Sequence, residues 1–192
     1  MNNLIIIGHP NKESFCYSGI AKTIKESLEQ SRESVYFVDL YAENKGFEFH
    51  KDKIKEYKSL IEWADRIYFI SPVWWFRTTP MLESFFDQIF TPGFAYKFIP
   101  VTKMYGYPKP LLSHKKVRTY LTHGAPAFPV LTLYLNSVKL RLVMGVFTFV
   151  FGWKPSLWLK TKQFWSVPFV DKKKRAKYLR VVKEDIRKDL GL

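Results

Sequence analysis

Cysteine is almost absent from this chain, since Cys16 is the only one among 192 residues. A single cysteine excludes a disulfide within the chain and a cysteine-based metal site, and we expect no metal. It fits a reducing compartment, so we expect a cytoplasmic protein. The first residues, MNNLIIIGHP, have neither the basic start nor the apolar core of a secretory signal, and they predict a strand.

Long apolar runs are also missing. The longest nearly apolar run, residues 142–153, is shorter than the roughly 20 residues that span a bilayer. We expect it to hold a buried helix end that leads into a strand.

Acidic residues are scarce in the second half. Residues 1–96 hold 11 Lys and Arg against 13 Asp and Glu, whereas residues 97–192 hold 20 against 4. This imbalance indicates an anionic partner such as nucleotide phosphates, an acidic protein or a membrane surface, and a basic face that meets only solvent is the alternative. We expect no nucleic-acid binding, because the sequence has no zinc-finger spacing, RNA-binding signature or helix-turn-helix pattern.

Apolar residues make up 47% of the chain, enough for one well-buried domain over residues 1–192. Strand and helix patterns alternate, which predicts an α/β fold with a doubly wound, five-stranded parallel sheet flanked by helices. We expect strands at 4–7, 34–40, 67–70, 117–122 and 145–153, with an edge extension at 156–164. We expect helices after Ser14, at 54–64, from Pro80, at about 129–141 and after Asp171, with a surface loop at 42–53. A lid or partner contact is expected at 97–116, where Met104, Tyr105 and Tyr107 are costly to leave in water, and a structural wrap that covers the core is the alternative.

Large aromatic side chains follow the predicted strand 67–70. The loop there contains Pro72, Val73, Trp74, Trp75 and Phe76. Ligands bind at the carboxyl ends of the strands in an open parallel sheet, so this loop predicts a site for a flat, apolar ligand. The alternative is a corner of the core or a surface for a partner.

Two further turns fall at the same predicted edge of the sheet. After the first strand, Ser14 is placed as an N-cap, which would aim the N–H groups of Phe15, Cys16 and Tyr17 at an anion. After the fourth strand comes Thr122-His123-Gly124, where small residues let a ligand approach the backbone.

The stretch SPVWWFRTTPMLESFFDQIFTPGFAY and the turn from His9 to Cys16 resemble the flavin-binding segments of the NAD(P)H:quinone oxidoreductases with a flavodoxin-like fold. That family includes ancillary subunits of glutathione-gated potassium efflux systems. The resemblance implies a homodimer that binds FMN (or FAD) non-covalently, is reduced by NAD(P)H and passes two electrons to a quinone by ping-pong exchange. The residues that it places at the flavin are His9, Glu13, Ser14, Phe15, Cys16, Pro72, Val73, Trp74, Trp75, Phe76, Thr122, His123 and Gly124.

The sequence departs from the family in the turn after the fourth strand. The family has Thr-Thr-Gly-Gly there, whereas His123 replaces the second Thr and Ala125-Pro126 replaces the second Gly. The tyrosine and histidine that some members use in hydride transfer have no clear equivalents, so His123 is the sole candidate for catalysis, as a donor to a flavin or quinone oxygen. Three alternatives stay open: a flavin-binding ancillary subunit that docks on an acidic protein or membrane, an azo- or nitroreductase, and a flavin-free descendant.

Overall fold

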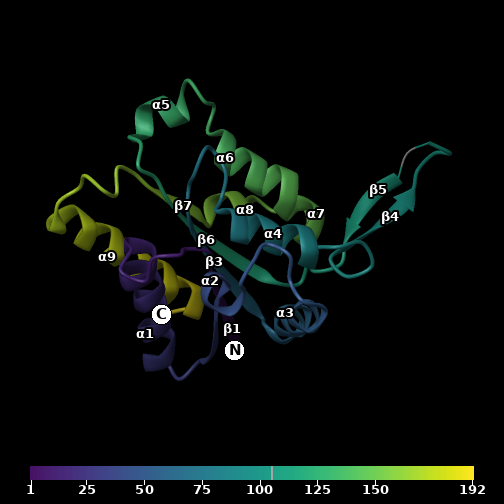
Figure 1. Ribbon diagram of the computed structural model, residues 1–192, viewed down its shortest axis with the longest axis horizontal. Helices are drawn as coiled ribbons and strands as arrows, with labels where there is room; N and C mark the ends of the chain where they lie inside the picture. Colours follow the sequence, from purple (N-terminus) through teal and green to yellow (C-terminus); the bar gives the residue numbers. More distant parts are fainter. Residues whose placement is uncertain (105) are drawn as a thin grey trace.

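The computed structural model describes residues 1–104 and 106–192, and its centre is a five-stranded parallel sheet (Figure 1). The strands lie in the order β2-β1-β3-β6-β7, and each pairs in parallel with its neighbours. Their bounds are β1 (Asn2–Ile7), β2 (Ser34–Asp39), β3 (Arg66–Pro72), β6 (Lys116–Thr122) and β7 (Thr161–Phe164). The predicted flavodoxin-like fold is confirmed.

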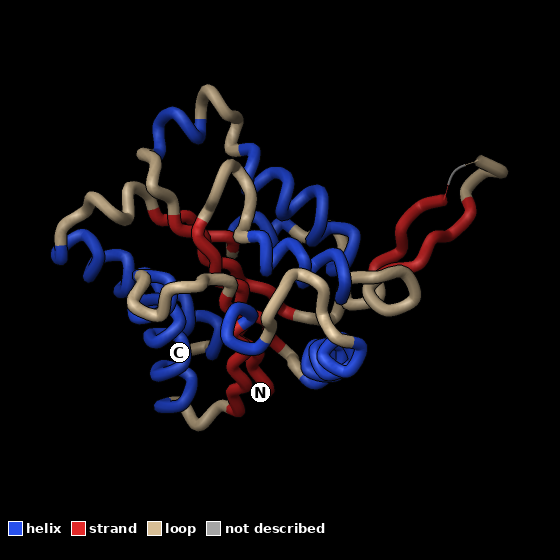
Figure 2. Tube along the Cα trace, viewed as in Figure 1, coloured by secondary structure: helices blue, strands red, loops and turns tan. Residues whose placement is uncertain are grey.

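Helices cover both faces of the sheet, because successive side chains of a buried strand point to opposite faces (Figure 2). Leu4 and Ile6 of β1 belong to one core cluster, and Ile5 and Ile7 belong to the other. The first face carries α2 (Leu40–Glu43), α3 (Lys51–Trp63), α4 (Pro80–Ile89), α6 (Ser137–Leu140), the π-helix η2 (Arg141–Phe147), α7 (Thr148–Phe151) and α8 (Pro155–Leu159). The second face carries the π-helix η1 (Phe15–Ala21), α1 (Lys22–Gln30) and α9 (Lys172–Leu190).

The prediction of a strand at 145–153 is wrong, because this segment is largely helical. η2 continues directly into α7, and the fifth strand is β7, within the segment predicted as an edge extension. Phe147, Val150 and Phe151 are buried at a spacing of three and four residues, which puts them on one helical face. The run of Val and Phe has a high strand propensity, which packing against the sheet outweighs. No helix in the described part of the chain is long and apolar enough to cross a membrane.

The predicted helix at 129–141 is interrupted. α5 (Ala127–Leu131) ends early, and the turn before α6 holds Leu135 and Asn136 in the left-handed region, with φ of 49° and 51°. The predicted surface loop 42–53 includes the end of α2 and the start of α3, and its Phe49 is buried.

The segment 97–116, predicted to be a lid or a partner contact, contains an antiparallel hairpin. β4 (Tyr96–Pro100) pairs with β5 (Gly106–Pro110), and the pair projects away from the sheet (Figures 1 and 2). Met104 is 98% exposed and Tyr107 is exposed as well, although both were expected to avoid water. Tyr105, which carried the same expectation, lies outside the described residues.

A buried charge cluster fastens α9 to the amino end of the sheet. Arg118 of β6 contacts Asp185 at 3.0 Å through Nη1, and it contacts Asp189 at 2.6 Å through Nε. Lys160 also reaches Asp189, at 2.6 Å, and Arg66 donates to the Asp189 carbonyl. Burial opposes ionisation of the Asp189 carboxyl, but hydrogen bonds from Arg118 and Lys160 outweigh it and lower its pKa. The cluster fixes the position of α9 relative to the strands.

Candidate functional site

A cleft of about 430 Å³ opens at the carboxyl ends of β1, β3 and β6. All of the predicted site residues line it except Trp75 and Phe76. Three further residues complete the lining, namely Val167, Pro168 and Arg175. The structure therefore brings together three turns that are far apart in the sequence, at the edge where parallel sheets bind ligands.

The turn after β1 is held by its own polar side chains. His9 Nδ1 accepts from the Asn11 N–H at 3.0 Å, and Asn11 Oδ1 accepts from the Glu13 N–H at 2.8 Å. Ser14 caps η1 as predicted, since its Oγ accepts from the Tyr17 N–H at 3.3 Å. This bond uses the Tyr17 N–H, so the prediction that Tyr17 aims its N–H at an anion is wrong. The N–H groups of Phe15 and Cys16 begin the helix, where no intrahelical acceptor is within reach.

Gly8 lets α4 approach the end of β1. A Cβ on Gly8 would lie 2.7 Å from Thr79 Oγ1 and 3.0 Å from the Leu82 Cβ. Thr79 Oγ1 donates to the Gly8 carbonyl at 2.8 Å, and Thr78 Oγ1 donates to Glu83 at 2.5 Å. These two threonines thus fix the loop between β3 and α4 and leave ligand contacts to other residues.

The aromatic loop is a tight hairpin turn. The Val73 N–H donates to the Thr122 carbonyl at 2.8 Å, and Trp74 and Arg77 exchange backbone bonds of 2.9 and 3.1 Å. Trp75 and Phe76 occupy the two corners, with φ of 49° and 57°. Such corners favour Asn and Gly, so two bulky residues there store strain of about 1–3 kcal/mol each. Strain of this size is often found at functional sites.

This turn points its aromatic side chains in different directions. Trp74 lines the cleft and meets the His9 ring edge-on, with ring centroids 6.3 Å apart. Trp75 is 92% exposed, and Phe76 packs on Tyr134 with centroids 4.4 Å apart. The side chains of Trp75 and Phe76 therefore lie outside the cleft, on the surface beside its mouth.

The turn after β6 forms the far wall. His123 is buried, stacks on Trp165 at 4.3 Å, and joins its Nε2 to Gln163 Oε1 at 3.0 Å. Burial lowers the pKa of His123 to about 4, although the bond to Gln163 acts in the opposite direction. Its ring is therefore neutral at pH 7. Cys16 and Thr122 are joined at 3.1 Å, and burial raises the pKa of the Cys16 thiol to about 12.

Arg175 is the contribution that the sequence reasoning missed. Its Nη2 donates to the Val167 carbonyl at 3.1 Å, while its Nε is buried with no partner among the described residues. A buried N–H without an acceptor is unfavourable, so this guanidinium is suited to an anionic ligand in the cleft. Arg175 directly follows Lys172, Lys173 and Lys174 in a basic run that reads as a solvated face. The excess of positive charge in residues 97–192 is the only sequence signal that indicates an anion-binding role in this half of the chain.

The flavodoxin-like fold family matches residues 1–149, which is more than half of the chain. The chain belongs to this family. An uncharacterized NAD(P)H oxidoreductase of Haemophilus influenzae is 28% identical over 137 residues, which is 65% of each protein. NAD(P)H dehydrogenase [quinone] 1 of Cavia porcellus is 26% identical over 150 residues, or 63% of this chain and 52% of the relative. The matched segments thus span about half to two thirds of these relatives. The predicted resemblance to the NAD(P)H:quinone oxidoreductases is confirmed.

Solved structures show the same fold over nearly the whole chain. Smu.1420 from Streptococcus mutans UA159 is 26% identical with a TM-score of 0.82, covering 98% of this chain and 100% of its own. An FMN-dependent NADH-azoreductase from Bacillus anthracis str. Ames Ancestor, in complex with FMN, is 16% identical with a TM-score of 0.72, covering 97% and 98%. At that identity, the second comparison shows the flavodoxin-like fold alone.

Proposed function

We propose that this protein is an FMN-dependent NAD(P)H oxidoreductase that reduces a quinone. The observation that carries the proposal is the cleft, where the turns predicted to bind flavin meet around the unpaired Nε of Arg175. The names of the relatives, NAD(P)H oxidoreductase and NAD(P)H dehydrogenase [quinone], agree with it.

The lining residues fit FMN. Arg175, Ser14 and the N–H groups of Phe15 and Cys16 provide a cation and hydrogen-bond donors for one phosphate. Trp74, Val73 and His123 provide apolar and aromatic walls for a flat ring system. A volume of about 430 Å³ and a single lining arginine favour FMN over FAD, which carries two phosphates and an adenosine.

A bound flavin supplies two-electron chemistry, which oxidises NAD(P)H and reduces a quinone to the quinol. The residues of this chain hold and orient it. His123 and Cys16 keep one protonation state near pH 7, since burial moves both pKa values away from neutrality. We therefore assign His123 to the wall of the cleft and not to proton donation, and we place both substrates in turn in the same slot, by ping-pong exchange.

A homodimer is part of this proposal. Exposed apolar side chains from the aromatic loop and from the α5–α6 region lie next to each other through the contact between Phe76 and Tyr134. The exposed members are Trp75, Phe76, Phe128, Leu131, Leu133, Tyr134 and Leu135. A second copy of the chain would cover them beside the mouth of the cleft. Sizing with light scattering at micromolar concentration should give a dimer and, for Trp75→Asp, a monomer; a monomeric parent protein would contradict this part.

The proposal is tested first by the visible absorption spectrum of the purified protein and the mass of any released chromophore. We expect flavin bands that bleach on addition of NADPH or NADH, and a released mass equal to that of FMN. A protein that stays colourless after incubation with FMN would refute the proposal.

Arg175 provides a sharper test, because riboflavin lacks the phosphate. Arg175→Gln should weaken FMN binding by about 10- to 100-fold, as expected for one charged hydrogen-bonding group. Riboflavin binding should be unchanged. The matched control is Lys172→Gln, which removes one positive charge from the exposed start of the same helix. An equal effect of both variants on FMN would show that Arg175 acts only through net charge.

A further inference from the structure

We define the hairpin arm as β4 and β5 with residues 101–104 at its tip. The chain leaves the body of the protein and returns to it at neighbouring residues. The Leu111 N–H donates to the Ala95 carbonyl at 2.9 Å, so both ends of the arm start from one point (Figure 1). None of the cleft-lining residues belongs to it. The described part of the arm therefore does not close the cleft of its own chain.

Apolar side chains cover the arm where it meets water. Phe98, Ile99, Val101, Met104 and Tyr107 are all exposed. An extended segment that leaves this much apolar surface in solvent is unfavourable unless another phase or partner covers it.

The only charged side chains on the described part of the arm are cationic. Lys97, Lys103 and Lys109 are exposed, and Lys97 lies directly opposite Lys109 in the β4–β5 register. Like charges opposite one another destabilise a strand pair. The sequence offers no nearby counter-charge, since no Asp or Glu lies between Asp87 and Asp171.

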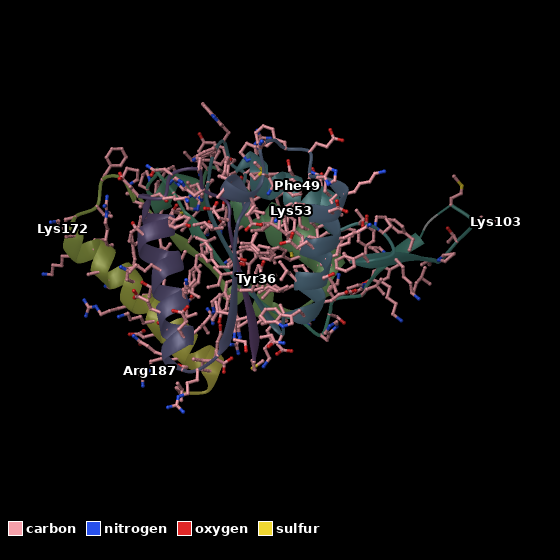
Figure 3. The ribbon with its side chains drawn as sticks, turned by 60° about the horizontal axis from the view of Figure 1, so that its bottom comes forward. Tyr36, Phe49, Lys53, Lys103, Lys172 and Arg187 are labelled. Atoms are coloured by element: carbon pink, nitrogen blue, oxygen red, sulfur yellow. The ribbon has the colours of Figure 1, made fainter. Side chains whose placement is uncertain are left out.

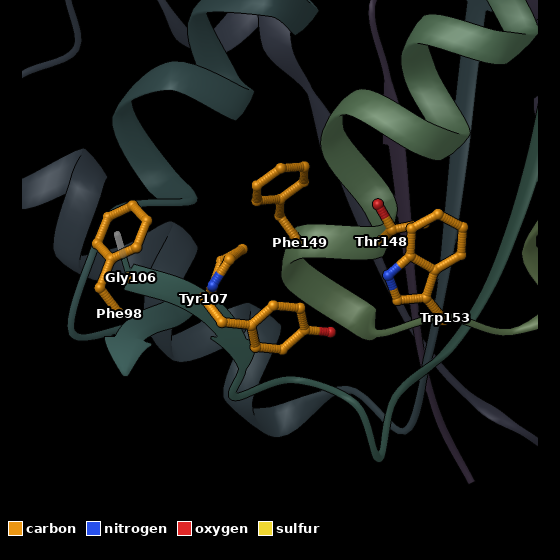
Figure 4. Close-up of a pocket in the computed structure, with 7 residues that line it drawn as sticks. Phe98, Gly106, Tyr107, Thr148, Phe149 and Trp153 are labelled. Carbon is orange, nitrogen blue, oxygen red and sulfur yellow. The ribbon is translucent and has the colours of Figure 1, made fainter. Parts of the chain in front are cut away.

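An apolar groove extends this surface onto the body of the protein. It measures about 350 Å³ and lies between the arm, through Phe98 and Tyr107, and α7 with the residues after it, through Phe149 and Trp153 (Figure 4). Trp153 is 67% exposed. Tyr and Trp at the base of an apolar tip match the aromatic side chains that lie at the headgroup level of membranes.

We propose that the hairpin arm binds the surface of an anionic lipid bilayer, with Val101 and Met104 entering the interface and the three lysines contacting lipid phosphates. Apolar insertion and electrostatic attraction are the two contributions that hold peripheral proteins on such surfaces. Pairing of the arm with the arm of a second copy is disfavoured, because a symmetric contact would set lysines against lysines. The proposal does not depend on flavin binding.

Vesicle flotation of the full-length protein provides the test. We expect binding to vesicles that contain anionic phosphatidylglycerol, little binding to pure phosphatidylcholine, and release by high salt. Replacing Lys97, Lys103 and Lys109 by Gln should lower the partition coefficient by about 100- to 200-fold, since each lysine near such a surface contributes about 1 kcal/mol. Val101→Asp with Met104→Asp should abolish binding.

The matched control is the Gln replacement of Lys172, Lys173 and Lys174, which changes the net charge by the same amount. Lys172 and Lys103 lie at opposite ends of the molecule (Figure 3). We expect less than a three-fold effect from this control. Equal losses in both triple variants would overturn the proposal in favour of non-specific attraction.

A label at the tip reports insertion directly. Met104→Cys provides a reactive thiol for a polarity-sensitive dye, because Cys16 is buried and has a raised pKa. The dye emission should shift to the blue on anionic vesicles. The proposal is overturned if the parent protein does not bind these vesicles, or if the arm variants change the oligomeric state measured by light scattering and leave vesicle binding intact, because the arm would then be a protein contact.

Discussion

Arg141 and Glu83 form a two-pronged ion pair that joins η2 to the first turn of α4. Nη1 lies 3.0 Å from Oε1, and Nη2 lies 2.6 Å from Oε2. Glu83 Oε1 also accepts from the Thr78 N–H at 3.0 Å. One largely buried carboxylate thus supports both a helix of the core and the end of the aromatic loop that lines the cleft.

Glu83→Gln should weaken this support. We expect the free energy of unfolding to fall by about 1–3 kcal/mol, the range for hydrogen bonds to charged groups, and FMN affinity to fall with it. Urea denaturation and FMN titration measure the two effects. Asp87→Asn, an exposed carboxylate on the same helix, is the control, and equal results for both variants would show that the ion pair has no specific role.

Gly8→Ala should destabilise the protein by about 1–3 kcal/mol, because the new methyl group would overlap a threonine that is itself hydrogen-bonded to Gly8. Gly46→Ala is the matched control, since a Cβ there meets nothing within 4 Å. Thermal or urea denaturation measures the stability of the two variants relative to the parent protein. A Gly8→Ala variant as stable as the parent would mean that α4 can shift away from β1 at little cost.

Asp189→Asn should cost about 3–5 kcal/mol at pH 7, since it leaves the buried Arg118 and the half-buried Lys160 without their shared carboxylate. The pKa of Asp189 is lowered in the folded state, so its contribution to stability is present above the pKa of the unfolded chain and is lost as the pH falls below about 4. The difference between parent and variant should therefore shrink in acid. Glu184→Gln, exposed on the same helix, should have little effect on the urea midpoint at any pH.

His123 should make the stability of the protein depend on pH in a second range. Its folded pKa of about 4 lies below the usual value near 6.5, so the unfolded state takes up a proton first as the pH falls. Stability that is complete above pH 6.5 should thus decline between about pH 6.5 and 4, and His123→Gln should flatten this slope. If His123 were protonated in the folded protein at pH 6, its NMR ring signals would titrate there, contrary to this expectation.

Much of the fold and cleft could be predicted because local chemistry and long-range structure agree there. Ser14 at a helix start, Pro72 at a strand end and small residues after β6 each mark the carboxyl edge of a parallel sheet. The helix at 145–153 could not be predicted in this way, because its Val and Phe side chains suit a strand equally well until their packing partners are known.

The remaining errors concern residues whose role depends on distant neighbours. Arg175 sits in a basic run, and only the fold shows that its Nε is buried beside the cleft. The backbone bond of Tyr17 and the outward position of Trp75 depend on the geometry of single turns, which a sequence pattern does not specify.

The family match ends at residue 149, whereas the arginine that completes the cleft belongs to α9, the last helix. That helix is fastened at its far end by Asp185 and Asp189 and reaches the cleft with its first turn. The end of α9 that lines the cleft is thus separate from the end that anchors the helix, so substitutions in its first turn can change the charge of the cleft and leave the buried ion pairs intact.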